Sequence, residues 1–224
     1  MERLTQLHAE MTGCERCPRL RAYCAQVAAT RVKRYRDQEY WGRPVPGFGD
    51  PAAQLFILGL APGAHGANRT GRMFTGDDSG AWLYGVLHQF GFANQPISVG
   101  RDDGLVLHQV YIGNVCRCAP PDNKPAPAEL TACQPFLEQE LALLLQVKVV
   151  LALGRIAFER YARLLKDRGI HVGKPVFAHG AEYLLDGRVL LCSYHPSRQN
   201  TNTGLLTESM WVDVFARARE LIDP

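Results

Sequence analysis

Residues 54–66 read Gln54-Leu-Phe-Ile-Leu-Gly-Leu-Ala-Pro-Gly-Ala-His-Gly66, an apolar run that passes directly into a glycine-rich segment. The run over 54–60 is short, and three similar runs follow at 108–115, 147–153 and 189–194. Each run is apolar on both of its alternating faces, which is typical of a strand in a parallel sheet covered on both sides. The sequence therefore predicts four parallel strands at the centre of the fold.

Segments with helical periodicity lie before, between and after these strands. The last of them carries one apolar stripe from Met210 to Ile222, as does a helix packed on a sheet. Ser79 can cap another helix, which Gly91 ends. This alternation predicts one α/β domain, a three-layer α/β/α sandwich with a central four-stranded parallel sheet. We expect the remaining helices at 2–12, at 18–29, up to about Leu145, and at 155–166.

The composition suits a globular protein, with 46% apolar and 21% charged residues in a chain of 224. The longest apolar runs fall well short of the ~20 residues of a membrane span, so we expect no integral membrane protein. The charged N-terminal segment differs from a signal peptide, and we expect a cytoplasmic protein. The net charge of +3 indicates no partner by itself. Residues 19–43, however, hold seven arginines and lysines against two acids, which is either a phosphate-binding patch or a solvated surface.

Ligands of open α/β sheets bind where the parallel strands end. In this chain the segments 59–66, 114–121 and 195–200 follow three of the predicted strands, and they hold its most unusual residues. The glycines of the first segment match neither a dinucleotide fingerprint nor a P-loop. They let the backbone approach a ligand closely, or they only make a tight turn. The candidate site therefore lies at this edge of the sheet.

Four further side chains are expected at the same edge. Phe74 and the acids Asp77 and Asp78 lie between the first strand and its helix. The helix dipole favours the ionised form of an acid at this place, so one alternative is that Asp77 or Asp78 serves only as a helix cap. His195 follows the last strand and precedes a proline, so it projects over the edge. His65 is a reserve candidate because it lies on the same edge.

Four cysteines have the spacing of a metal centre. Cys14-x2-Cys17 is a chelating turn, and Cys118-x14-Cys133 supplies a second pair. Four thiolates suit either a structural zinc ion or an iron–sulfur cluster. Cys116 competes for the third place, but Cys118 is preferred because it lies in a proline-rich loop that can turn toward a distant segment.

The surroundings of the remaining cysteines indicate ordinary packing. Cys192 lies inside an apolar run and Cys24 inside a predicted helix, so both are expected to be structural. Pro135 is best tolerated in the first turn of a helix, which predicts that Cys133 lies at a helix start or junction.

The ordered set Gly59-Leu-Ala-Pro-Gly63, Thr70–Asp77, Asn114, Cys118-Ala-Pro-Pro121 and His195-Pro-Ser197 resembles the uracil-DNA glycosylase superfamily, most closely its family 5. The resemblance implies hydrolysis of the N-glycosidic bond of a damaged base in DNA. It implies a single such domain over residues 1–224, on which the Cys14–Cys17 segment packs through the metal centre. That centre would be a structural [4Fe–4S] cluster bound by Cys14, Cys17, Cys118 and Cys133.

The resemblance also assigns roles at the strand ends. It implies that Phe74 stacks on a flipped base, that Asn114 meets its Watson–Crick edge and that His195 faces its O2. The backbone around Ala61 and Gly63 would line the pocket.

One departure from the family concerns the attacking water. Ala61 stands where the best-known members have an Asp, and Leu60 stands where a related family has a Glu. The family-5 pattern instead assigns the hydrolytic role to Asp77. Since no lysine is in place as a Schiff-base nucleophile, we expect a free base and an abasic site without strand cleavage.

The expected partner is DNA that contains uracil or another deaminated or modified base, bound by a monomeric protein. Arg117, Arg198, Gln199 and Asn200 are predicted to contact this DNA, together with the basic segment 19–43. The main alternative is a non-enzymatic nucleic-acid-binding module held together by zinc. A small-molecule hydrolase is a second alternative, which the missing phosphate-binding motifs disfavour.

Overall fold

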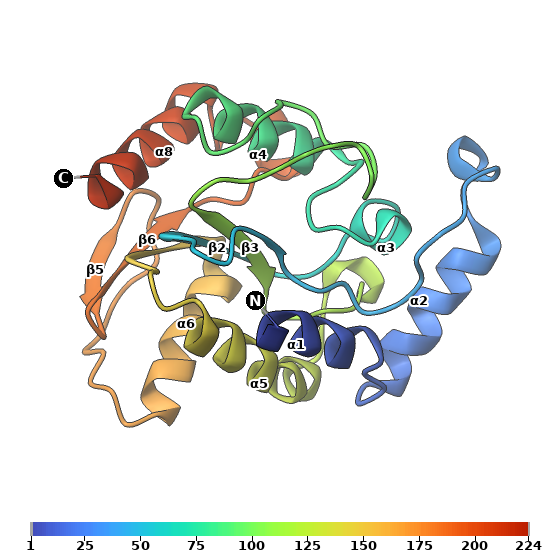
Figure 1. Ribbon diagram of the computed structural model, residues 1–224, viewed down its shortest axis with the longest axis horizontal. Coiled ribbons are helices and arrows are strands. Elements are labelled where there is room, and N and C mark those ends of the chain that lie inside the picture. Colours follow the sequence, from blue (N-terminus) through green and yellow to red (C-terminus); the bar gives the residue numbers. More distant parts are fainter. Residues whose placement is uncertain (1, 224) are drawn as a thin grey trace.

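The computed structural model describes residues 2–223 and contains a mixed sheet with the strand order β1-β3-β2-β4-β6-β5 (Figure 1). The four inner strands run parallel and are the four that the sequence predicts. The two outer strands pair antiparallel with their neighbours, so the prediction of four strands was incomplete. The strands are β1 Phe48–Gly49, β2 Leu55–Gly59, β3 Val110–Asn114, β4 Val149–Leu153, β5 Glu182–Leu185 and β6 Arg188–Ser193.

Both outer strands have a local cause. β5 and β6 form a hairpin whose turn, Asp186-Gly187, has positive φ at both residues, as the common two-residue hairpin turn requires. β1 is only two residues long and follows a Pro/Gly-rich segment. It is held on β3 by backbone pairing at Phe48 and Gly49 rather than by an apolar pattern of its own.

Helices cover the sheet on both faces. In Figure 1, α4 and α8 lie above it and α1, α5 and α6 lie below it, which confirms the α/β/α layers. The helices are α1 Glu2–Thr12, α2 Pro18–Thr30, α3 Ala67–Thr70, α4 Asp78–Gln89, α5 Pro127–Leu143, α6 Arg155–Asp167, α7 Arg198–Asn202 and α8 Glu208–Ile222, with 3₁₀ turns at Lys33–Tyr35 (η1) and Pro121–Asn123 (η2).

Successive side chains of the strands point to opposite faces of the sheet and so belong to two separate hydrophobic cores. On β2, Phe56 and Leu58 pack with the buried side chains of α1, α5 and α6, whereas Leu55 and Ile57 pack with those of α4 and α8. All five residues of this strand are buried, as the two-sided apolar pattern predicted. The parallel strands therefore end at one shared edge of the molecule, where the loops after β2, β3 and β6 begin.

The prediction for Pro135 was wrong. Pro135 lies in the interior of α5, and Cys133 is therefore a mid-helix residue rather than one at a helix start. A proline costs a helix one backbone hydrogen bond. Here that cost is outweighed by packing, since Phe136, Leu137 and Leu141 of the same helix are buried in the core.

Within residues 2–223, no helix is both long and apolar enough to cross a membrane.

Candidate active site

Phe74 and His195, 121 positions apart in the chain, lie face to face at the edge where the parallel strands end. Their ring centroids are 5.8 Å apart and the rings are inclined by 27°. Phe74 belongs to the segment between α3 and α4, and His195 follows β6. The structure thus brings together the two rings that the sequence placed at this edge.

Asn114, the last residue of β3, is buried beside Phe74 with only 2% of its surface exposed. Its Nδ2 donates to the sulfur of Met73 at 2.9 Å. Its Oδ1 is buried and has no hydrogen-bond partner among the described residues. Both this oxygen and the Phe74 ring lie against Gly59, where a Cβ would overlap the oxygen. An unpaired buried acceptor is costly, so Oδ1 is available for a donor on a ligand.

Asp77, rather than the predicted Ser79, caps α4. Its Oδ1 accepts a hydrogen bond from the Gly80 N–H at 2.9 Å. The other carboxylate oxygen lies against Gly63 and Gly66 of the loop after β2. Burial raises the pKa of this carboxyl, and the Gly80 N–H opposes that effect. Asp77 is thus both the cap that the sequence allowed and a carboxylate with one oxygen left for chemistry.

His195 lies in an environment that disfavours its charged form. Burial lowers the pKa of its imidazole to about 4, so the ring is neutral at pH 7. Its backbone carbonyl accepts from Asn200 Nδ2 at 2.8 Å, and Ser197 caps the short helix α7 that follows. These contacts fix the loop that carries the imidazole.

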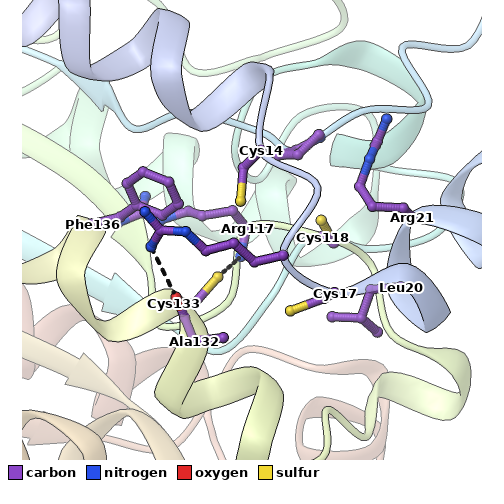
Figure 2. A pocket seen from close by; sticks show the side chains of 11 residues that line it. Cys14, Cys17, Leu20, Arg21, Arg117, Cys118, Ala132, Cys133 and Phe136 are labelled. Atoms are coloured by element: carbon purple, nitrogen blue, oxygen red, sulfur yellow. Dashed lines mark hydrogen bonds between the residues drawn. The ribbon is translucent and has the colours of Figure 1, made fainter.

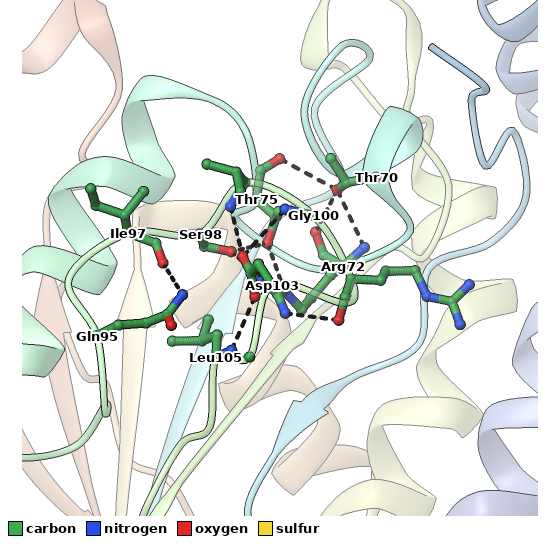
Figure 3. A network of polar contacts seen from close by, with 12 residues as sticks. Thr70, Arg72, Thr75, Gln95, Ile97, Ser98, Gly100, Asp103 and Leu105 are labelled. Carbon is green, nitrogen blue, oxygen red and sulfur yellow. Dashed lines mark hydrogen bonds and ion pairs between the residues drawn. The ribbon is translucent and has the colours of Figure 1, made fainter.

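The Phe74 backbone has an unusual conformation, with φ at +52°. Such a conformation is unfavourable for a bulky residue and persists where the surroundings impose it. Here the hydroxyl of the next residue, Thr75, is hydrogen-bonded to the Ser98 hydroxyl at 2.6 Å and accepts a hydrogen bond from Arg72 Nε at 3.1 Å. Arg72 also forms a buried ion pair with Asp103 at 2.5 Å, and Figure 3 shows the resulting polar network. Sequence reasoning missed this network because its two halves lie about thirty residues apart.

The predicted pocket-lining residues Ala61 and Gly63 are half-buried in the loop after β2. This loop joins β3 through hydrogen bonds from Val115 N to Gly59 O at 3.0 Å and from Cys116 N to Leu60 O at 2.9 Å. The reserve candidate His65 lies in the same loop, where its Nδ1 is 3.1 Å from the Tyr40 hydroxyl.

The four predicted DNA contacts separate into two groups. Arg198 and Gln199 are exposed on α7 and Asn200 is half-buried there; Arg198 forms an ion pair with Asp78 at the start of α4. Arg117, in contrast, is only 1% exposed and is paired with the buried Glu140 of α5. The prediction that Arg117 contacts DNA was therefore wrong, because its charge is satisfied inside the protein.

The predicted cysteine quartet lines one pocket, which Figure 2 shows from close by. Cys14 and Cys17 come from the turn between α1 and α2, Cys118 from the loop after β3, and Cys133 from α5. Three arginines also line or border this pocket: Arg16, Arg21 and Arg117. Within the described chain, no three His, Cys, Asp or Glu side chains converge closely enough to hold a metal ion.

The other cysteines are buried, as expected for Cys24 and Cys192. Cys116 does not line this pocket, and its thiol donates to the backbone carbonyl of Cys118 at 3.5 Å. The preference for Cys118 over Cys116 stays a prediction, supported by the lining of the pocket.

Comparison with known proteins gives consistent matches over most of the chain. A family model described as the uracil DNA glycosylase superfamily matches residues 46–219. The type-5 uracil-DNA glycosylase of Thermus thermophilus is 52% identical over 212 residues, which cover 94% of this chain and 94% of that protein. The type-5 enzyme of Pyrobaculum aerophilum is 42% identical, covering 93% and 88%. A type-4 uracil-DNA glycosylase of Thermotoga maritima is 30% identical over 68% of this chain and 69% of its own length.

Proposed function

This chain belongs to the uracil-DNA glycosylase superfamily, and from that premise we propose that it hydrolyses the N-glycosidic bond of uracil in DNA. The family resemblance expected from the sequence is confirmed. The products would be free uracil and an abasic site. None of Phe74, Asp77, Asn114 and His195 carries an amine, so the proposal includes no Schiff base and no strand cleavage.

The observation that carries this proposal is the meeting of four side chains at one edge of the sheet. The rings of Phe74 and His195 face each other, and Asn114 Oδ1 lies beside the Phe74 ring at Gly59. Asp77 reaches the same loop at Gly66. A base can reach these groups only after it leaves the duplex, which costs a few kcal/mol and least for a mispaired base. Stacking on Phe74 would return roughly 1–3 kcal/mol.

Bond breaking leaves positive charge on the sugar and negative charge on the departing base. The Asp77 oxygen that does not cap α4 would stabilise the sugar and orient a water molecule toward C1′. The base needs hydrogen-bond donors, and a neutral His195 imidazole supplies one N–H toward its O2. The unpaired Asn114 Oδ1 would accept the N3–H of uracil, a position at which unprotonated cytosine has no hydrogen. The site thereby favours uracil over the normal base from which it arises.

Phosphate binding is proposed for the basic residues near this edge. The pKa of Asp78, at the start of α4, is lowered by Arg198 and also by the charge of Arg34. Since Arg34 belongs to the 3₁₀ turn η1, that turn lies near the same edge of the sheet. Arg19, at the other end of the basic segment, is neutralised by Glu129 at 2.7 Å. The part of the segment near η1 is therefore proposed to join Arg198 as a candidate contact, whereas Arg19 is not. A monomer acting on DNA remains our expectation.

We propose a [4Fe–4S] cluster in the cysteine pocket, held by Cys14, Cys17, Cys118 and Cys133. Four sulfurs around a pocket suit a cluster, which spaces its ligands around its corners, whereas one zinc ion draws them to a point. Arg117 lines this pocket, and its backbone N–H donates to Cys133 Sγ at 3.4 Å. A backbone N–H directed at a cysteine sulfur fits an anionic cluster. When bound, the cluster would join the N-terminal segment to α5 as a structural link.

A cytoplasmic location also remains part of the proposal. All seven cysteines are free, which suits a reducing compartment.

The test is a glycosylase assay with a uracil-containing duplex and an otherwise identical thymine control. We expect an alkali-labile abasic site only in the uracil strand, and an intact strand before alkali treatment. Activity on a free nucleoside with none on DNA would overturn the proposal in favour of a small-molecule hydrolase. A panel with hypoxanthine and ethenocytosine measures whether other bases are accepted.

The purified protein also separates a cluster from zinc. A brown protein with about four irons per chain supports the cluster, and a colourless protein with one zinc ion contradicts it. A colourless zinc protein without excision would instead favour the nucleic-acid-binding module.

A further inference from the structure

Arg69, on the short helix α3, is a buried cation without an acidic partner. Only 7% of its surface is exposed, and none of the ion pairs found within residues 2–223 includes it. Its three nitrogens donate instead to neutral oxygens: Nε to His65 O at 2.7 Å, Nη1 to Gln38 Oε1 at 2.6 Å and Nη2 to Gly76 O at 3.0 Å. Burying a charge costs free energy unless the charge is paired and hydrogen-bonded, so an unpaired buried guanidinium calls for an explanation.

The third of these bonds ends one residue before Asp77. Gly76 has φ at +78°, and a Cβ there would overlap Arg69 Nη2, so only glycine lets the guanidinium approach so closely. The Tyr35 ring of η1 covers the guanidinium, with Arg69 Cζ 4.0 Å from the ring centroid. The first bond, to His65 O, fixes the loop that contacts the other side of Asp77. Arg69 therefore joins both segments that enclose the carboxylate.

The charges around Asp77 favour the same assignment. Asp78 on α4 disfavours ionisation of Asp77, whereas Arg69 on α3 and Arg198 on α7 favour it. Tyr84 on α4 is a titratable neighbour whose burial raises its pKa above the usual value, so it is neutral at physiological pH. His65 lies in the adjoining loop, hydrogen-bonded to Tyr40. Since Arg198 is 73% exposed and already paired with Asp78, Arg69 is the cation whose field reaches Asp77 with least screening by solvent.

We propose that Arg69 is a positioning residue for glycosidic-bond hydrolysis: it holds Asp77 in place through Gly76 and keeps its carboxylate ionised. The inference rests on the proposed role of Asp77. Loss of the Arg69 charge makes the carboxylate easier to protonate. Since the ionised form is the active one, activity in acid is then lost at a higher pH than in the unmodified protein.

The experiment is a pH profile of single-turnover uracil excision with enzyme in excess, which measures the chemical step. For Arg69→Gln we expect the acid limb to move up by about one pH unit, the lower end of the effect of a nearby opposite charge. Arg69→Lys should keep the limb near its original pH. Gln38→Glu supplies a second, nearly isosteric test, because its new carboxylate would pair with Arg69. It should move the limb in the same direction by less.

Two controls identify the limb and the fold. Asp77→Asn should abolish the acid limb, and Arg163→Gln, at an exposed arginine on α6, should leave it unchanged. Profiles of Arg69→Gln and Gln38→Glu that are lowered uniformly, with the limb unmoved, would overturn the inference and make Arg69 merely structural. If Arg69→Gln does not fold, Gln38→Glu decides alone. An unmodified protein without excision would instead refute the proposed function.

Discussion

The base site and the cysteine pocket each gather four residues from distant parts of the chain, but they differ in what holds these residues. At the base site, protein hydrogen bonds fix each element: Gly80 holds Asp77, Met73 holds Asn114, and the Arg72–Asp103 network holds the segment around Phe74. In the cysteine pocket, by contrast, all four thiols are free, and within the described residues no three of them converge as metal ligands.

This difference separates rate from stability. A site held by the protein itself is ready before substrate binds, so its substitutions should lower the excision rate with little effect on folding. A site completed by a bound group transfers the binding free energy of that group to folding. Substitutions in the cysteine pocket should therefore lower stability and spare the chemistry.

Asp77→Asn should have the largest effect, a loss of about 10³-fold in single-turnover excision of uracil, because the amide cannot stabilise positive charge on the sugar. The Asn side chain can still accept from Gly80 N–H, so the melting temperature and DNA affinity should be nearly unchanged. Asp78→Asn is the matched control. A rate within a few-fold of the unmodified protein would remove Asp77 from the mechanism.

His195→Ala should lower the same rate by about 10²-fold, because one donor to the departing base is lost. DNA affinity, measured by fluorescence anisotropy, should fall far less than the rate. His88→Ala, at an exposed histidine on α4, is the control. Equal losses of rate and affinity would indicate that His195 only shapes the loop.

Asp103→Asn tests whether the base site depends on its supporting network. Breaking a buried ion pair costs about 3 kcal/mol of stability, and the released Phe74 segment should lower excision by about tenfold. Denaturant unfolding and single-turnover kinetics measure the two effects, with the exposed Asp102→Asn as control. An unchanged rate at lowered stability would show that the Phe74 conformation does not need the network.

Cys17→Ser should lower the stability of the protein and leave the excision rate nearly unchanged. We expect loss of the brown colour and a melting temperature lower by about 4 °C or more, which corresponds to at least 1 kcal/mol for a chain of this size. The rate per folded molecule should stay within twofold. Cys192→Ala, at a buried cysteine outside the pocket, should keep its colour. A colour that survives Cys17→Ser would exclude this cysteine from the ligands.

Arg198→Gln should have the smallest effect, since the residue is exposed. We expect DNA affinity to fall a few-fold and the slope of log affinity against log salt to decrease by about one. The excision rate at saturating enzyme should not change. A salt slope equal to that of the unmodified protein would mean that Arg198 contacts no phosphate.

The parallel sheet was predictable because each inner strand is apolar on both faces, a pattern that depends only on the local sequence. The hairpin at Asp186-Gly187 was not predicted, although an Asp-Gly pair between two apolar runs is a local signal for such a turn. The residues of the base site could be placed together because all of them follow strand ends or precede a helix.

Other features depend on partners that no local pattern reveals. The burial of Arg117 requires Glu140, which lies on the inner face of α5. Pro135 continues that helix because distant core residues stabilise it. Arginine is a residue type usually found at the surface, and only the folded chain shows that Arg69 and Arg72 are buried.

At Gly66 a side chain is excluded because the Asp77 carboxylate fills the space, as Asn114 does at Gly59. The two glycines thus leave the space that is occupied by an acid and an amide from other parts of the chain. During divergence, either glycine could gain a side chain only if its facing residue shrank or was replaced, so we expect Gly66 to covary with position 77 and Gly59 with position 114.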